Sequence, residues 1–139
     1  MKYIYPAIFT LDKSDKAFPN GVYQVKFVDL DTCYTFGNTL EEAYENAADA
    51  LNLALWDLEE RKAAIPAATA VSEVHCGTDA FVSLVTADTL EYRKQYDTKA
   101  VRKSLTIPRW LDTLAQENNI NFSNILKRAL LKELNISPQ

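Results

Sequence analysis

The first third of the chain alternates between apolar and polar residues with the two-residue period of β-strands. Lys2 to Thr10 and Val22 to Val28 show this alternation, and a third short run, Cys33 to Phe36, ends at Gly37. Pro6 removes one backbone donor, which predicts that the first strand lies at a sheet edge or beside a bulge. A polar connection over Leu11 to Asn20 and a short link over Asp29 to Thr32 join the three runs, and this order predicts an antiparallel meander.

A long amphipathic helix is predicted after the third strand. Thr39 and Glu42 have the spacing of a capping box, in which each side chain bonds the other residue's backbone N–H. Pro66 forbids continuation, so the helix ends by Ala64. The apolar stripe at helical spacing consists of Leu40, Ala43, Tyr44, Ala47, Leu51, Leu55 and Leu58. This stripe predicts that the helix covers one face of the sheet as the second layer of a core.

The remaining elements of this part are a strand and a short helix. Phe81 to Thr86 has strand character, Asp88 to Gln95 predicts the helix, and Pro66 to Asp79 is an irregular connection. The order strand, strand, strand, helix, strand predicts an α+β domain over residues 1–95. Residues 96–100 are the expected hinge into a separate domain over residues 101–139.

The C-terminal stretch predicts a strand followed by two helices. Val101 to Ile107 alternates, and Pro108 then occupies the first turn of a helix, where a missing N–H costs nothing. Asn118-Asn119 ends that helix, and Asn121 is the expected N-cap of the next one. A unit of this length buries too little apolar surface to stand alone, and a lone strand leaves its backbone groups unpaired. Its simplest partner is a second copy of itself.

This stretch resembles the ribbon-helix-helix family of dimeric DNA-binding domains, represented by the Arc and MetJ repressors. The resemblance implies a two-stranded ribbon in the major groove, with Arg102, Ser104 and Thr106 reading base edges. Arginine can bond guanine with two donors, and the two hydroxyls fit several base edges. The alternative is a helical hairpin that follows an ordinary edge strand.

Phosphate contacts are expected beside the base-reading positions. Lys103 departs from the apolar residue expected on the inner face of the ribbon, and it can extend outward to a phosphate. At the start of the second helix, free N–H groups of Phe122, Ser123 and Asn124 can hold another phosphate.

Charge is divided unequally along the chain. The net charge of −4 argues against nucleic-acid binding, but it is an average over two different parts. Residues 99–139 carry seven basic and three acidic side chains, whereas residues 1–98 carry eight basic and sixteen acidic ones. The division indicates nucleic acid as a partner at one end and a different, basic partner at the other.

Tyr23 to Leu51, YQVKFVDLDTCYTFGNTLEEAYENAADAL, closely resembles the HicB antitoxin domain. That domain has a Tyr-x-Val-x-Phe strand, Asp-Leu, a Cys-x-Thr-x-Gly strand and Thr-Leu-Glu-Glu-Ala. This chain departs from the usual pattern at Val28, at Asp31-Thr32 and at Asn38, where Pro, Pro-Gly and Asp are common. These changes affect turns.

The resemblance implies a truncated ribonuclease-H-like domain without that enzyme's metal-binding carboxylates. It would mask a small basic HicA-type toxin that cleaves messenger RNA, while the ribbon-helix-helix tail dimerises and represses the shared operon by binding operator DNA. We expect no enzyme activity and no cofactor. Whether dimers pair into tetramers through the N-terminal part is left open.

The residues leave three other possibilities to consider: a metal site, a catalytic dyad and a small-molecule sensor. Asp29, Asp31, Glu41, Glu42 and Asp49 are candidate ligands for a two-metal nuclease site, but adjacent Glu41 and Glu42 diverge on a helix, so we expect no metal site. The neighbouring pair of His75 and Cys76 does not face one another as a catalytic dyad. The second functional hypothesis is a repressor whose N-terminal domain senses a small molecule, although the chain has no cofactor motif.

The chain has no apolar run of membrane-spanning length, and a strand begins where a signal peptide would be. We therefore expect a cytoplasmic protein, with Cys33 and Cys76 as unpaired thiols.

Overall fold

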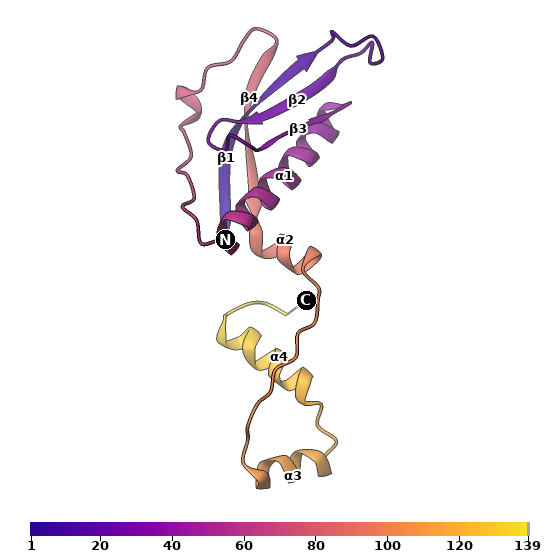
Figure 1. The fold of residues 1–139 in the computed structure, drawn as a ribbon, viewed down its shortest axis with the longest axis vertical. Coiled ribbons are helices and arrows are strands. Elements are labelled where there is room, and N and C mark those ends of the chain that lie inside the picture. Colours follow the sequence, from indigo (N-terminus) through magenta and orange to yellow (C-terminus); the bar gives the residue numbers. More distant parts are fainter. Residues whose placement is uncertain (139) are drawn as a thin grey trace. The chain divides into compact units, whose positions relative to one another are not determined.

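The computed structural model describes residues 1–138 and divides the chain into two compact units, Met1–Lys99 and Ala100–Gln139 (Figure 1). Each unit is described by itself below. The first contains β1 (Lys2–Asp12), β2 (Val22–Phe27), β3 (Tyr34–Gly37), α1 (Leu40–Glu60), the 3-10 turn η1 (Val71–Glu73), β4 (Ala80–Asp88) and α2 (Thr89–Tyr96). The second contains α3 (Arg109–Glu117) and α4 (Phe122–Glu133).

The four strands form one antiparallel sheet in the order β3-β2-β1-β4. The first three are neighbours in chain order, so the predicted meander is confirmed, and β4 joins it on the other side of β1. With one long helix on one face of the sheet, the first unit has the mixed α+β architecture that the pattern predicted.

β1 lies inside the sheet, so the predicted edge position is wrong for the strand as a whole. β2 pairs with it only over Ala7 to Asp12, whereas β4 pairs with it over Lys2 to Thr10. The N–H of Leu11 donates to the carbonyl oxygen of Asp79 at 3.1 Å, so odd-numbered residues of β1 direct their backbone groups toward β4. The nitrogen of Pro6 therefore faces the β2 side of β1. Pairing with β2 covers only Ala7 to Asp12, so Pro6 has no β2 residue opposite it.

Helix α1 begins at its predicted cap, with one change of partner. The Oγ1 of Thr39 accepts from the backbone N–H of Glu42 at 3.1 Å. The Glu42 carboxylate does not return to Thr39, as a capping box requires, but accepts from the N–H of Asn38 at 3.2 Å. The helix ends at Glu60, and Lys62 turns away with a positive φ of 53°.

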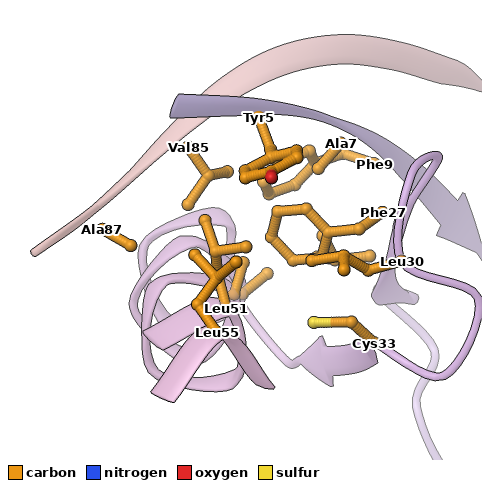
Figure 2. Packing of buried hydrophobic residues seen from close by; sticks show 13 residues of the cluster. Tyr5, Ala7, Phe9, Phe27, Leu30, Cys33, Leu51, Leu55, Val85 and Ala87 are labelled. Carbon is orange, nitrogen blue, oxygen red and sulfur yellow. The ribbon is translucent and has the colours of Figure 1, made fainter. Parts of the chain in front are cut away.

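One face of α1 packs on the sheet and closes the core (Figure 2). Ala43, Ala47, Leu51 and Leu55 are buried against Phe9, Phe27 and Val85 from the strands. Leu40 and Tyr44, which the stripe also contained, remain exposed. Tyr44 lies at the border of the stripe, where its ring stacks on that of Phe9 with 6.3 Å between the ring centres. Its ring therefore covers the core without being buried in it.

The second unit contains two short helices with asparagines at their ends. Pro108 is the N-cap of α3 and not part of its first turn, so this helix begins one residue later than predicted, at Arg109. α4 has the predicted cap, Asn121. α3 ends in a left-handed residue, Asn119, whose N–H donates to the carbonyl of Gln116 at 3.1 Å. This is the predicted helix-terminating use of asparagine.

The strand expected over Val101 to Ile107 is absent from the single chain, where residues 97–107 form no regular element. A strand exists only when a neighbour pairs with its backbone groups, and this chain alone supplies none there.

Candidate functional site

The expected base-reading side chains lie on an open segment of the second unit. Arg102, Ser104 and Thr106 are all exposed, and Lys103 beside them is exposed as well. Within residues 1–138, no hydrogen bond or ion pair engages these four side chains. They are therefore available to a ligand or to a second chain.

The N-terminus of α4 offers two free backbone donors instead of three. The N–H of Asn124 donates to Oδ1 of its own cap, Asn121, at 3.1 Å. The expected phosphate site at this helix start therefore depends on the N–H groups of Phe122 and Ser123. The cap and the three donors were both predicted, but the cap itself occupies one of these donors.

Apolar side chains of the second unit are not covered. Within residues 100–138 no residue is buried. The large apolar side chains that remain 41% to 74% exposed are Val101, Leu105, Ile107, Trp110, Leu111, Leu114, Ile120, Phe122, Ile125, Leu130 and Leu134. Trp110, Leu111 and Leu114 recur at helical spacing along α3, and Ile125, Leu130 and Leu134 lie on or just after α4, so each helix presents an apolar face without a partner within one chain.

A polar cluster around Glu59 joins distant parts of the first unit. Its Oε1 accepts from the hydroxyl of Tyr3 at 2.8 Å and from Oγ1 of Thr89 at 2.9 Å. Its Oε2 pairs with Nη2 of Arg93 at 2.9 Å. The amino group of Met1 donates to Thr89 at 3.0 Å. The cluster therefore fixes the start of β1 and the start of α2 on the last turn of α1.

These contacts determine the ionisation of the cluster. Burial alone raises the pKa of the Glu59 carboxyl, but the hydrogen bonds from Tyr3 and Thr89 and the charges of the N-terminus and Arg93 leave that pKa below its ordinary value. Burial and the bond to Glu59 raise the pKa of Tyr3 to about 12. The carboxylate is therefore charged, and the phenol neutral, at neutral pH.

Aromatic and polar contacts hold the rest of α2 on α1. The hydroxyl of Tyr92 donates to Oδ1 of Asp49 at 2.9 Å. The Tyr92 ring packs edge-on against the Trp56 ring, with 5.9 Å between the ring centres. The guanidinium of Arg93 lies 5.7 Å from the Trp56 ring centre. Burial and the Asp49 carboxylate raise the pKa of Tyr92 to about 12.

Three of the five acidic residues that were candidate metal ligands have structural partners. Asp29 accepts from the backbone and hydroxyl of Thr69, Glu42 caps α1, and Asp49 accepts from Tyr92. Among residues 1–138, no group of three or more His, Cys, Asp and Glu side chains is placed to hold a metal ion.

The two cysteines are unpaired, as expected. Cys33 is buried, and burial raises the pKa of its thiol to about 11. Cys76 is exposed in the connection before β4. A thiol with a raised pKa is a poor nucleophile, so Cys33 acts as a core residue.

The family pattern described as HicB-like antitoxin of bacterial toxin-antitoxin systems matches residues 5–130. The chain belongs to this antitoxin family. The match extends through both units, so the resemblance found in Tyr23 to Leu51 is confirmed and reaches beyond it.

Solved structures agree with the family. A toxin-antitoxin complex from Streptococcus pneumoniae contains a chain that is 27% identical, with a TM-score of 0.61, covering 96% of this chain and 99% of that one. The antitoxin HicB of Burkholderia pseudomallei shares the fold at 24% identity and a TM-score of 0.51, covering 95% and 98% of the two chains. No curated protein matches the chain at a significant level.

Among residues 1–138, no helix is both long enough and apolar enough to cross a membrane.

Proposed function

We propose that this antitoxin binds and neutralises a HicA-type toxin that cleaves messenger RNA, and that it represses transcription of its own operon. Residues 1–95 are the toxin-binding domain, and residues 101–139 are a dimeric ribbon-helix-helix domain joined to it by a hinge at 96–100. The observation that carries the DNA-binding half is the uncovered apolar face of the second unit.

A second copy of the chain is the partner that this face fits best. A unit of about 40 residues without a buried side chain does not hold a stable fold by itself. Two copies would cover each other's apolar side chains and would pair Val101 to Ile107 as two antiparallel strands. The missing strand of the single chain is what this dimer would form.

The ribbon would then separate two sets of side chains. Because strand residues alternate between faces, Val101, Leu105 and Ile107 would turn inward while Arg102, Ser104 and Thr106 turn outward. The outward set suits the major groove, where arginine bonds guanine and hydroxyls fit several bases. Lys103 lies on the inward side, so its aliphatic stem would pack at the border while its ammonium group reaches a phosphate.

Backbone contacts would orient the dimer on DNA. The two free N–H groups at the start of α4, those of Phe122 and Ser123, suit one phosphate on each half-site. The net charge of +4 over residues 99–139 favours this end of the chain for DNA.

The acidic first part is the proposed toxin-binding end. Residues 1–98 carry a net charge of −8, which attracts a basic protein and raises its rate of association. The Streptococcus pneumoniae relative was solved as a toxin-antitoxin complex, which supports a protein partner for this chain. The proposed partner is a small basic toxin whose catalytic or RNA-binding face the antitoxin covers.

Co-expression with the product of the neighbouring gene tests the proposal. We expect the chain to retain a small basic protein through purification, to restore growth of cells that express this protein, and to protect its own upstream DNA. A chain that retains no protein, and whose DNA affinity changes when a metabolite is added, would favour the small-molecule sensor instead.

A further inference from the structure

The sheet has one face that α1 does not cover. Phe27 of β2 is buried against α1 (Figure 2), and Gly37 of β3 lies against Ala43 of that helix. Because strand side chains alternate, the even-numbered residues of β1, β2 and β3 point to the open face. Strand pairing arranges six of them in two rows, Ile8, Lys26 and Tyr34 in one and Thr10, Gln24 and Phe36 in the next.

These two rows line a hollow of about 530 Å³, the open-face hollow. That volume is in the range of sites that hold small molecules or single groups of larger ones. Tyr34 is 74% exposed and Phe36 63% exposed. Within residues 1–138, neither ring stacks on another aromatic ring. Two aromatic side chains of one strand are therefore available to a ligand.

The open-face hollow carries one positive charge and no negative one. Among its lining residues only Lys26 is charged, and within residues 1–138 its ammonium group has no ion-pair partner. Asp12, two residues beyond Thr10, accepts from the N–H of Ser14 at 2.9 Å and from the Gln24 side chain at 3.2 Å. Seven of the sixteen acidic residues of the first unit belong to α1, on the other side of the sheet. A polyanion therefore fits this surface better than a basic protein does.

We propose that the open-face hollow binds single-stranded RNA. Bases that are not stacked in a duplex gain free energy by stacking on exposed aromatic side chains, and four-stranded sheets that present such rings are a common RNA-binding surface. This inference concerns the first unit alone, and it depends neither on the proposed toxin nor on the proposed operator contacts.

The arrangement of the side chains fits two successive nucleotides. Tyr34 and Phe36 are two residues apart on one strand, about 6.7 Å, so each ring can hold one base. Lys26 lies opposite Tyr34 in the strand pairing, where its ammonium group can reach the phosphate between the bases. The Nε2 of Gln24 donates to Asp12, so its amide oxygen is left to accept from a 2′-hydroxyl, which DNA lacks.

RNA binding by the full-length chain tests the proposal. The probe is a fluorescein-labelled, uridine-rich single-stranded RNA of about 12 nucleotides, and fluorescence anisotropy measures its affinity. We expect Tyr34→Ala and Phe36→Ala each to weaken binding about tenfold, whereas Tyr34→Phe keeps the ring and leaves binding unchanged. Ile4→Ala is the matched control, because Ile4 is another exposed apolar residue of the same face, outside the hollow.

The charged contact has its own measurement. Lys26→Ala should lower the salt slope of RNA binding by about 0.7, the value for one phosphate of a single strand. Lys2→Ala removes an exposed lysine from the same face, outside the hollow, and should leave the slope unchanged. Equal changes for the two variants overturn the proposal.

The basic second unit can also hold RNA through charge, so ultraviolet cross-linking followed by peptide mass spectrometry locates the probe. We expect a cross-linked peptide that contains Tyr34 and Phe36, and cross-links confined to residues 99–139 overturn the proposal.

Three further outcomes also overturn it. One is an equal affinity of Tyr34→Ala, Phe36→Ala and the native chain, once circular dichroism verifies that the variants are folded. Another is that single-stranded DNA of the matching sequence binds as tightly as the RNA. The third is that Tyr34→Ala releases a co-expressed basic protein but keeps its RNA affinity, because the surface then belongs to that protein.

Discussion

One carboxylate, Glu59, holds together the start of β1, the start of α2 and the end of α1. It lies in the last turn of α1 and is not one of the residues of that helix's apolar stripe. Its side chain is only 19% exposed, because Tyr3, Thr89 and Arg93 converge on it from other elements. The sequence gives no signal for this cluster, since its members are 30 to 56 residues apart from Glu59.

Glu59→Gln should destabilise the first unit by about 1–3 kcal/mol at neutral pH, the usual cost of weakening hydrogen bonds to a charged group. An amide keeps one acceptor, but its NH₂ group faces the Arg93 guanidinium. Because the native pKa of Glu59 is lowered, its contribution is present above the ordinary value of 4.5 and is lost as pH falls through the lower folded value. Urea unfolding at pH 7 and at about pH 3 measures both effects.

Glu60→Gln is the control for that variant. Glu60 also pairs with Arg93, at 3.1 Å, but its side chain is 59% exposed, so its loss should cost less than about 1 kcal/mol. Equal losses for the two variants at pH 7, or a Glu59→Gln defect that persists undiminished in acid, would contradict the role of Glu59.

Arg102→Ala should weaken binding to the operator by about 1–3 kcal/mol and leave binding to random DNA nearly unchanged, because a bidentate contact to guanine discriminates between bases. Titrations of operator and random duplexes at the same ionic strength measure the two affinities.

Lys103→Ala is the matched comparison at the next position. A phosphate contact has no sequence preference, so this variant should lose affinity equally on both duplexes and lower the salt slope by about 1. If Lys103→Ala lost affinity only for the operator, the phosphate role of Lys103 would be wrong. If Arg102→Ala lost affinity equally for both duplexes, the base-reading role of Arg102 would be wrong.

At the scale of elements, local signals succeeded and pairing between distant segments was harder to predict. The caps at Thr39 and Asn121 and the left-handed end at Asn119 depend on neighbours in the chain, and the structure has all three. The interior position of β1 depends on β4, whose residues pair with those of β1 across 70 to 86 positions of the chain, and Pro6 alone indicated an edge. The strand predicted over 101–107 has no partner within one chain, and the structure has no regular element there.

Gly37→Ala should destabilise the first unit strongly, by about 2 kcal/mol or more, because β3 and the first turn of α1 approach each other at that residue. An added Cβ would lie 2.3 Å from the backbone nitrogen of Ala43 and 2.6 Å from its Cα. Thermal or urea unfolding monitored by circular dichroism measures the loss.

Gly77→Ala is the control for this close approach, since an added Cβ there meets no atom within 4 Å. It should change the free energy of unfolding by less than about 0.5 kcal/mol. If both glycine variants unfolded at the same denaturant concentration, the proximity of β3 and α1 would not be what requires Gly37.

At the scale of the whole molecule, the two units differ in how they achieve stability. The first buries a core between its sheet and α1, whereas residues 100–138 bury no side chain within one chain. The charge division follows the same boundary, with the acidic part ahead of residue 99 and the basic part after it. The proposed toxin binding and the proposed DNA binding should therefore be separable by deletion.

Deleting residues 97–139 should abolish repression and retain at least part of the toxin neutralisation, because every residue of the buried core lies before the deletion. A promoter fusion reports repression, and growth of cells that express the toxin reports neutralisation. The complementary variant Leu105→Glu in the full chain should also abolish repression by placing a charge on the inward side of the ribbon, while the first unit stays intact. If the truncated chain folds but does not rescue growth, while Leu105→Glu does rescue it, then toxin binding requires part of the second unit and the proposed division of labour is wrong.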